Sequence, residues 1–274
     1  MLQARLKDWP NWGLDAEPRL VRTFSNGRNH QTALIESASK QYVLKIFDGP
    51  GQFATSAQQW AGKLGLSPAI IYADKELTIM DFISDLGHGE RSIASLAKSL
   101  SSLHSAPAPD WPRFNLLDFC DQYLMVADSR IQQWHTELLP GLQIFLDDST
   151  AWCPCHNDLV QENCLYDGKQ VQLIDWEYAM LNNPWFDIGA VTVYFDLDPQ
   201  QTTKFLNDYV SGWQHKVDQA IYYAAQLAVL WCDLLWHIEK YSSDYIDQQQ
   251  TRFKRLRSIA AKLSIELPKL HSLD

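Results

Sequence analysis

Two polar clusters near the middle of the chain constrain both its fold and the chemistry it can perform. The first has the pattern H-x-D-x-x-x-x-N and runs from His156 through Asp158 to Asn163; the second is Asp175, which ends a short apolar strand. Three oxygen-bearing side chains on a loop and the strand after it can converge on one point. Phosphoryl transfer needs such a set: a carboxylate for the hydroxyl proton, and an amide oxygen and a second carboxylate for Mg²⁺. The pattern predicts Asp158 as the catalytic group and Asn163 and Asp175 as the metal ligands.

The same residues could also form an ordinary polar loop followed by a hairpin, with no chemical role. The joint pattern, placed after a β-rich region, favours the catalytic interpretation. His156 could be a catalytic base, but we expect it to hold the loop through hydrogen bonds to the backbone. Asp187, at the start of a predicted helix, is expected to be a structural hydrogen-bond acceptor near this loop.

The distribution of β-prone and helical segments indicates an α+β fold with two lobes. Up to residue 84 the chain contains short β-prone runs separated by turn formers, and from residue 85 helical patterns dominate. We predict a small β-rich nucleotide-binding lobe (1–84), a hinge at 83–92 and a helical catalytic and substrate lobe (85–274). The expected elements are strands at 19–24, 31–36, 41–47, 70–72 and 77–83, a hairpin turned at Asp167-Gly168, and helices at 52–64, 93–103, 116–139 (closed by Pro140-Gly141) and beyond 184.

Lys45 lies in the middle of the apolar run 43–47, as expected of a lysine that contacts the α and β phosphates of a nucleotide. A surface lysine at a strand edge is the alternative interpretation. The loop 25–32 before it joins two strands, and its backbone N–H groups, at Asn26 and Gly27, could cover the phosphates. With a single glycine, this loop could equally be a plain hairpin turn.

The segment 222–237 places polar and aromatic side chains on one predicted helix, among them Asp233 and Trp236. A carboxylate combined with aromatic rings is the chemistry that holds an ammonium or azolium cation. The alternative is a core helix whose polar stripe touches solvent. Glu177 and Tyr178, which follow the second motif, are also expected to face the cleft. These four residues are the candidate substrate contacts.

The chain has five cysteines, an odd number that, without an export signal, predicts reduced thiols in the cytoplasm. The run Cys153-Pro154-Cys155-His156 allows a zinc interpretation, with Cys164 nearby. The C-x-C-H spacing is cramped for a tetrahedral site and no second pair follows in the sequence. We therefore expect buried thiols beside the catalytic loop rather than a zinc site.

The formal net charge of −10 argues against nucleic acid as a partner, because nucleic-acid-binding proteins usually carry a basic face. An acidic surface suits a cationic small molecule, although most acidic proteins are simply soluble. The first ten residues lack the apolar core of a secretory signal, and the apolar segment 221–238 is interrupted by Gln226, Asp233 and His237. We therefore expect a cytoplasmic protein with no membrane partner, and the oligomeric state is left open.

Residues 153–190 resemble the choline/ethanolamine kinase and thiamine kinase group of the aminoglycoside-phosphotransferase-like kinases. The resemblance is carried by residues 155–166, 173–179 and 183–188, and extends less specifically over most of the chain. It implies a two-lobed protein-kinase-like fold with ATP between the lobes. The roles it implies are Asp158 as the catalytic aspartate, Asn163 and Asp175 as Mg²⁺ ligands, Lys45 at the phosphates, and Met80, Asp81 and Phe82 as the hinge that holds adenine through backbone groups.

The resemblance has one departure. The helix after the phosphate lysine normally supplies a glutamate that pairs with it, whereas residues 51–66 contain no acidic residue. Gln52, Gln58 or Gln59 could take that place by a hydrogen bond, or another group could hold the lysine.

Together these patterns predict an ATP- and Mg²⁺-dependent small-molecule kinase that phosphorylates a hydroxyl of a cationic alcohol such as choline, ethanolamine or thiamine. One alternative is an aminoglycoside or other sugar-hydroxyl kinase, whose larger polycationic substrates would need a wide acidic cleft. Another is a nucleotide-binding pseudokinase without catalysis, which the missing helix acid motivates.

Overall fold

The computed structural model describes residues 5–24, 30–49, 51–125, 127–211, 217–241 and 250–268. The chain forms two compact units. The first unit comprises Met1–Leu103 and Gln161–Ala179, and the second comprises His104–Val160 and Met180–Asp274. The chain thus returns to the first unit for one short segment, which carries both predicted metal ligands. The division into lobes at 1–84 and 85–274 stays a prediction.

The first unit is built on a five-stranded antiparallel sheet with the strand order β1-β2-β3-β5-β4. One face packs around the fully buried side chains of Ile35, Leu44 and Ile79. Because side chains alternate along a strand, burial of Leu44 directs the next residue, Lys45, to the opposite face. The strands are β1 (Arg19–Phe24), β2 (His30–Ser37), β3 (Lys40–Phe47), β4 (Ile70–Ala73) and β5 (Leu77–Asp81), preceded by the 3₁₀ helix η1 (Leu6–Asn11).

Helix α2 (Gln52–Lys63) packs near β4 and buries one face. The Thr55 hydroxyl of this face lies 2.9 Å from the hydroxyl of Thr78 on β5. Thr78 is paired with Lys45 across the sheet, and paired residues of an antiparallel ladder project to the same side. Helix α2 therefore lies over the part of the sheet that carries the lysine.

The short segment that returns to the first unit forms the hairpin expected from the sequence. Strands β7 (Cys164–Tyr166) and β8 (Val171–Leu173) pair, and the Asp167 carboxylate closes the turn by accepting two backbone N–H groups at 2.8 Å. Helix α3 (Glu90–His104) anchors the hairpin through serine hydroxyls that bond the backbone of Val171. The 3₁₀ turns η2 (Gln161–Asn163) and η3 (Trp176–Tyr178) lie at its two ends.

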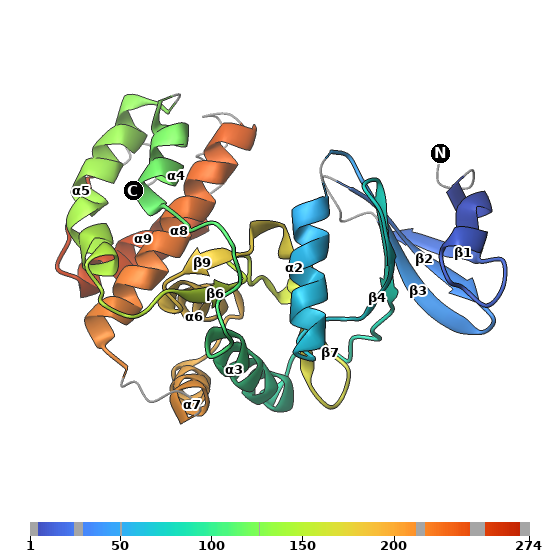
Figure 1. Cartoon of the computed structure of the whole chain (residues 1–274). Helices are drawn as coiled ribbons and strands as arrows, with labels where there is room; N and C mark the ends of the chain where they lie inside the picture. The colour runs from blue at the N-terminus through green and yellow to red at the C-terminus, as the bar shows by residue number, and fades with distance from the viewer. Residues whose placement is uncertain are drawn as a thin grey trace. The chain divides into compact units, whose positions relative to one another are not determined.

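The second unit is mainly helical. Helix α8 is its centre and packs against α4, α5, α6 and α9 (Figure 1). Trp134 and Trp231 are almost fully buried in this core. Helices α6 and α8 approach closely at Gly189, where a Cβ atom would lie 3.1 Å from the backbone of Ala225. The elements are α4 (Leu116–Leu124), α5 (Ser129–Leu146), β6 (Cys153–Cys155), β9 (Met180–Asn182), α6 (Trp185–Tyr194), α7 (Pro199–Ser211), α8 (Gln219–Tyr241) and α9 (Gln250–Lys262).

The single helix predicted at 116–139 is wrong in two respects. The chain breaks into α4 and α5, and the Asp128 carboxylate starts the second helix by accepting the N–H groups of Arg130 and Ile131. Helix α5 also continues through Pro140 to Leu146 instead of ending there. A proline inside a helix costs about 3 kcal/mol. Burial of Leu142 and Phe145 beyond it contributes roughly 1.5–3 kcal/mol each, which outweighs that cost.

Among the described residues, one helix is long and apolar enough to cross a membrane when judged by length and composition alone. It is α8, over Gln219–Lys240. Of its apolar stretch, 72% is buried inside the structure. This burial agrees with the expected core helix.

Candidate active site

Asn163 and Asp175 lie together at the open end of the hairpin in the first unit. The carbonyl of Asn163 accepts the N–H of Ile174 at 3.0 Å, and Asp175 follows directly. Asp175 has a left-handed backbone (φ 65°, ψ 64°), a conformation that costs an aspartate energy and is concentrated at functional sites. Strand pairing therefore brings the two predicted metal ligands next to each other.

Lys45 reaches the same point from β3. Its Nζ lies 2.6 Å from Oδ1 of Asp175, and the lysine side chain is only 13% exposed. The partner of the lysine in this structure is thus Asp175, which agrees with the second alternative, that a group other than the glutamines holds the lysine. Gln58 is buried, and its amide donates to the carbonyl of Pro68 and the sulfur of Met80. The other two candidates, at 52 and 59, are exposed.

The donor chemistry at this point fits Mg²⁺. The ion prefers hard oxygen ligands and usually keeps few protein contacts, so one amide oxygen and one carboxylate suffice. Asn163 is 7% exposed, whereas the side chain of Asp175 is 37% exposed and open to a ligand. The ion pair with Asp175 holds the ammonium group of Lys45 beside the oxygen donors. A positive charge at this point would attract the negatively charged phosphates of a nucleotide.

Glu177, predicted as a substrate contact, is held by His30 within the first unit. The Nδ1 of His30 accepts the N–H of Asp48 at 3.2 Å, so its Nε2 carries the proton and donates to Glu177 at 3.3 Å. The neighbouring Tyr178 is 37% exposed. Substrate roles for Glu177 and Tyr178 stay predictions.

The predicted adenine hinge forms the end of β5. The N–H of Asp81 bonds to the carbonyl of Ala69 at 2.9 Å, and that of Phe82 to the carbonyl of Gln41 at 3.4 Å. Met80 is buried. The N–H of Asp81 is thus engaged by the residue before β4 and that of Phe82 by β3, and adenine binding by Met80, Asp81 and Phe82 stays a prediction.

The predicted phosphate-covering residues, Asn26 and Gly27, lie in 25–29, outside the described residues. Their contact with phosphates also stays a prediction.

In the second unit, the buried carboxylate of Asp187 holds the loop that leads to Asp158. Its two oxygens accept the backbone N–H groups of His156 and Asn157, each at 2.8 Å. Asn157 has a left-handed backbone (φ 63°), which asparagine tolerates, and its side-chain oxygen accepts the amide of Asn182 at 2.8 Å. Asp158, the next residue, is partly exposed. The expectation that Asp187 is a structural acceptor is confirmed. His156 is fully buried, and the hydrogen bonds expected from its ring to the backbone stay a prediction.

His104 and Tyr209 complete this support, and the sequence patterns did not identify them. The Nε2 of His104 lies 3.1 Å from Oδ2 of Asp187, and its Nδ1 lies 2.9 Å from the Tyr209 hydroxyl, with all three side chains buried. Burial lowers the pKa of His104, but nearby Cys153 and the hydrogen bond to Asp187 raise it overall. In the sequence, His104 marked only the end of a helix, and no spacing connected it with the loop.

Asp233 belongs to an ion-pair network of the second unit. Its carboxylate lies 2.5 Å from Nε of Arg252 and 3.1 Å from Nδ1 of His237, and Lys240 lies 4.6 Å from the ring centre of Trp236. A carboxylate already balanced by an arginine attracts a further cation less strongly than an open one. Substrate roles for Asp233 and Trp236 stay predictions.

The charges of Asp233 and of the predicted catalytic residue Asp158 both influence the phenol of Tyr194. Burial raises its pKa well above the ordinary value; the charges of Asp233 and Asp158 raise it further, and Arg252 lowers it. Both carboxylates therefore act on one phenol in the second unit. Sequence patterns did not single out Tyr194, because this residue ends the apolar helix α6, where an aromatic side chain is expected to be part of the core.

Comparison with known proteins shows the family to which this chain belongs. The model of the phosphotransferase enzyme family matches residues 20–227. The protein LicA of Haemophilus influenzae is 33% identical over 271 residues, covering 87% of this chain and 99% of its own length. Thiamine kinase of Escherichia coli O157:H7 is 26% identical, covering 70% of this chain and 71% of its own. The chain therefore belongs to the phosphotransferase enzyme family.

Solved structures agree on the fold. A choline/ethanolamine kinase family protein from Mesorhizobium loti superposes with a TM-score of 0.77 at 19% identity, covering 95% of each chain. Choline kinase LicA from Streptococcus pneumoniae superposes with a TM-score of 0.76 at 18% identity, covering 95% of this chain and 98% of its own. These identities establish the fold alone, and the protein-kinase-like α+β fold is confirmed. With the family match and the relatives, the resemblance to choline and thiamine kinases and the small-molecule kinase class are also confirmed.

Proposed function

We propose that the protein is an ATP- and Mg²⁺-dependent kinase that phosphorylates the hydroxyl of a small cationic alcohol of the choline, ethanolamine or thiamine type. The observation that carries the proposal is the meeting of Lys45 with Asp175 at the end of the hairpin that begins at Asn163. A lysine, a carboxylate and an amide oxygen at one point are the groups that hold a nucleotide triphosphate with its metal.

Each residue has a defined part in the proposed reaction. Lys45 contacts the phosphates of ATP, and Asn163 and Asp175 hold Mg²⁺, which when bound neutralises charge on the phosphate oxygens. Asp158 orients the alcohol and accepts its proton while the oxygen bonds to the γ-phosphorus and ADP departs. Asp187 keeps the loop before Asp158 in shape through two backbone N–H groups. Catalysis thus depends mainly on positioning and charge neutralisation.

Charge and relatives support the choice of substrates. The chain is acidic, with a net charge of −10, which favours a cationic substrate over an anionic one. One structural neighbour is a choline kinase, another structure of LicA is a complex with AMP, and a sequence relative is a thiamine kinase. All five cysteines are buried thiols, which supports the expected cytoplasmic location.

The test is a screen of ADP release over choline, ethanolamine, thiamine and kanamycin, with and without Mg²⁺. We expect Mg²⁺-dependent turnover with one of the cationic alcohols, and its loss in Asp158→Ala while ATP still binds. Preference for kanamycin would instead identify an aminoglycoside kinase. Stabilisation by ATP without ADP release from any alcohol would identify a pseudokinase, and full turnover in Asp158→Ala would overturn the assigned roles.

A further inference from the structure

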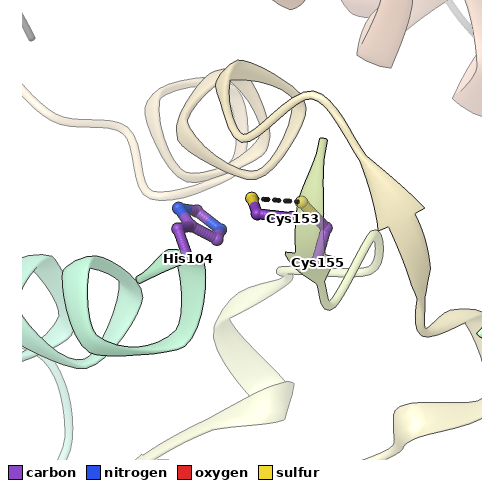
Figure 2. Close-up of side chains that lie close together, drawn as sticks. All are labelled: His104, Cys153 and Cys155. Carbon is purple, nitrogen blue, oxygen red and sulfur yellow. Dashed lines mark hydrogen bonds between the residues drawn. The ribbon is translucent and has the colours of Figure 1, made fainter. Parts of the chain in front are cut away.

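The second unit contains a cluster of metal-ligating side chains that the proposed phosphoryl transfer does not use. It consists of His104 at the end of α3 and of Cys153 and Cys155 on β6, whose side chains point toward one another (Figure 2). The three residues are buried, and one donor atom of each lies within 4.8 Å of the other two. The sequence allowed a zinc interpretation of the two cysteines with His156, which the cramped spacing disfavoured, whereas the structure brings His104 from a distant helix to the same cysteines.

The two sulfurs already have the separation that a tetrahedral metal requires. Cys153 and Cys155 are alternate residues of one strand and therefore project to the same side. Their Sγ atoms lie 3.8 Å apart, along the dashed line in Figure 2. Two thiolates on a tetrahedral zinc, each at about 2.3 Å, are separated by about 3.8 Å. An imidazole nitrogen would need to lie about 3.6 Å from each sulfur. Because the donor atoms already lie within 4.8 Å of one another, each nitrogen–sulfur distance has to shorten by at most about 1.2 Å.

The histidine is oriented as metal-binding histidines are. A ligating imidazole usually donates its other N–H to a carboxylate, which fixes the ring and its tautomer. Both ring nitrogens of His104 have a partner, Nε2 at 3.1 Å from the Asp187 carboxylate and Nδ1 at 2.9 Å from the Tyr209 hydroxyl, so the nitrogen that binds the metal exchanges one contact while the other keeps the ring fixed. Because Asp187 also holds the N–H groups of His156 and Asn157, a metal here would lie beside the loop that leads to Asp158.

The charges also balance. A divalent cation with two thiolates and a neutral imidazole is uncharged as a whole, which suits a buried position. Binding would release the two thiol protons to solvent. In the metal-free state both sulfurs contact the carbonyl of Asn182, at 3.8 and 3.6 Å, and these weak S–H interactions are the ones exchanged.

We propose that His104, Cys153 and Cys155 form a binding site for a zinc-type divalent cation, distinct from the Mg²⁺ site at Asn163 and Asp175. Imidazole and thiolate ligands select zinc-type ions, whereas Mg²⁺ requires oxygen donors. The two sites therefore do not compete for the same ion. The cation would fix His104 and, through Asp187, reinforce the loop that presents Asp158.

The test uses the full-length, chelator-treated and reduced protein in excess Mg²⁺, titrated with Co²⁺ and then Zn²⁺. We expect one equivalent of Co²⁺ to give thiolate-to-metal charge-transfer bands with the visible bands of a tetrahedral site, and Zn²⁺ to displace it. Cys153→Ser and Cys155→Ser should each lower the affinity at least tenfold and about halve the charge-transfer intensity per bound cobalt, and the double variant should remove the bands. Cys120→Ser is the matched control, because Cys120 and Cys232 form another buried thiol pair in the same unit.

X-ray absorption at the zinc edge of the wild-type complex gives the same answer without any variant. Two sulfur neighbours and one imidazole are the expected result. Only oxygen neighbours, no stoichiometric binding, or bands at full intensity in both Cys153→Ser and Cys155→Ser would overturn the proposal. None of these measurements depends on kinase activity, so their failure would leave the proposed phosphotransferase untouched.

Discussion

Replacing Asp187 by asparagine isolates the hydrogen bonds that support the loop before Asp158. The carboxylate accepts His156 N–H and Asn157 N–H at 2.8 Å each, on different oxygens, and His104 Nε2 at 3.1 Å. Asparagine has the same shape but one oxygen, so its NH₂ group must face one of the two backbone N–H groups. A buried donor without an acceptor costs about 1–3 kcal/mol, and the remaining bond loses its charge assistance, roughly 0.5–1.5 kcal/mol. We therefore expect a loss of about 1.5–4.5 kcal/mol in the free energy of unfolding.

The assay for Asp187→Asn is urea unfolding followed by tryptophan fluorescence, with hydrogen exchange of the peptide that contains His156 and Asn157. Asp208→Asn is the control for charge removal alone, because its exposed pair with Lys204 is worth about 0.3–0.5 kcal/mol. The variant at 187 should unfold at clearly lower urea and exchange these amides faster than both the control and the wild type. Equal stability of the two variants, or unchanged exchange in the loop, would refute the reasoning.

Three further substitutions test other parts of the structure. Gly189→Ala should lower the free energy of unfolding by about 1–3 kcal/mol in denaturant titrations, because the added Cβ would lie 3.1 Å from the backbone of Ala225. An unchanged unfolding midpoint would contradict the close approach of α6 and α8. Pro140→Ala should stabilise the protein by about 1 kcal/mol or more, since α5 continues through this position; a lower melting temperature would mean that proline suits the local backbone. Lys45→Ala should reduce kcat/KM for ATP roughly ten- to hundred-fold, because a charge-assisted contact contributes about 1.5–3 kcal/mol. Wild-type kinetics in this variant would exclude Lys45 from the phosphate site.

Sequence patterns predicted features whose cause is local. The turn at Asp167 and the pairing that follows from it depend on residues close together in the chain, so the approach of Asn163 to Asp175 could be anticipated. The features that sequence patterns missed depend on tertiary packing. Helix α5 runs through Pro140 because distant helices bury the residues beyond it. The pairing of Lys45 with Asp175 and the position of His104 beside Cys153 join residues far apart in the chain, and no sequence spacing indicates either contact.

The central claim is that Asp158 acts on the alcohol, and the most direct test is Asp158→Asn assayed for both turnover and nucleotide binding. General-base catalysis contributes about 10²–10⁴-fold, so kcat for the preferred alcohol should fall by that factor. The dissociation constant for ATP with Mg²⁺, measured by calorimetry, should stay near the wild-type value because Lys45, Asn163 and Asp175 are intact. A kcat within a few-fold of wild type, or a loss of ATP binding that accounts for the whole defect, would contradict the account.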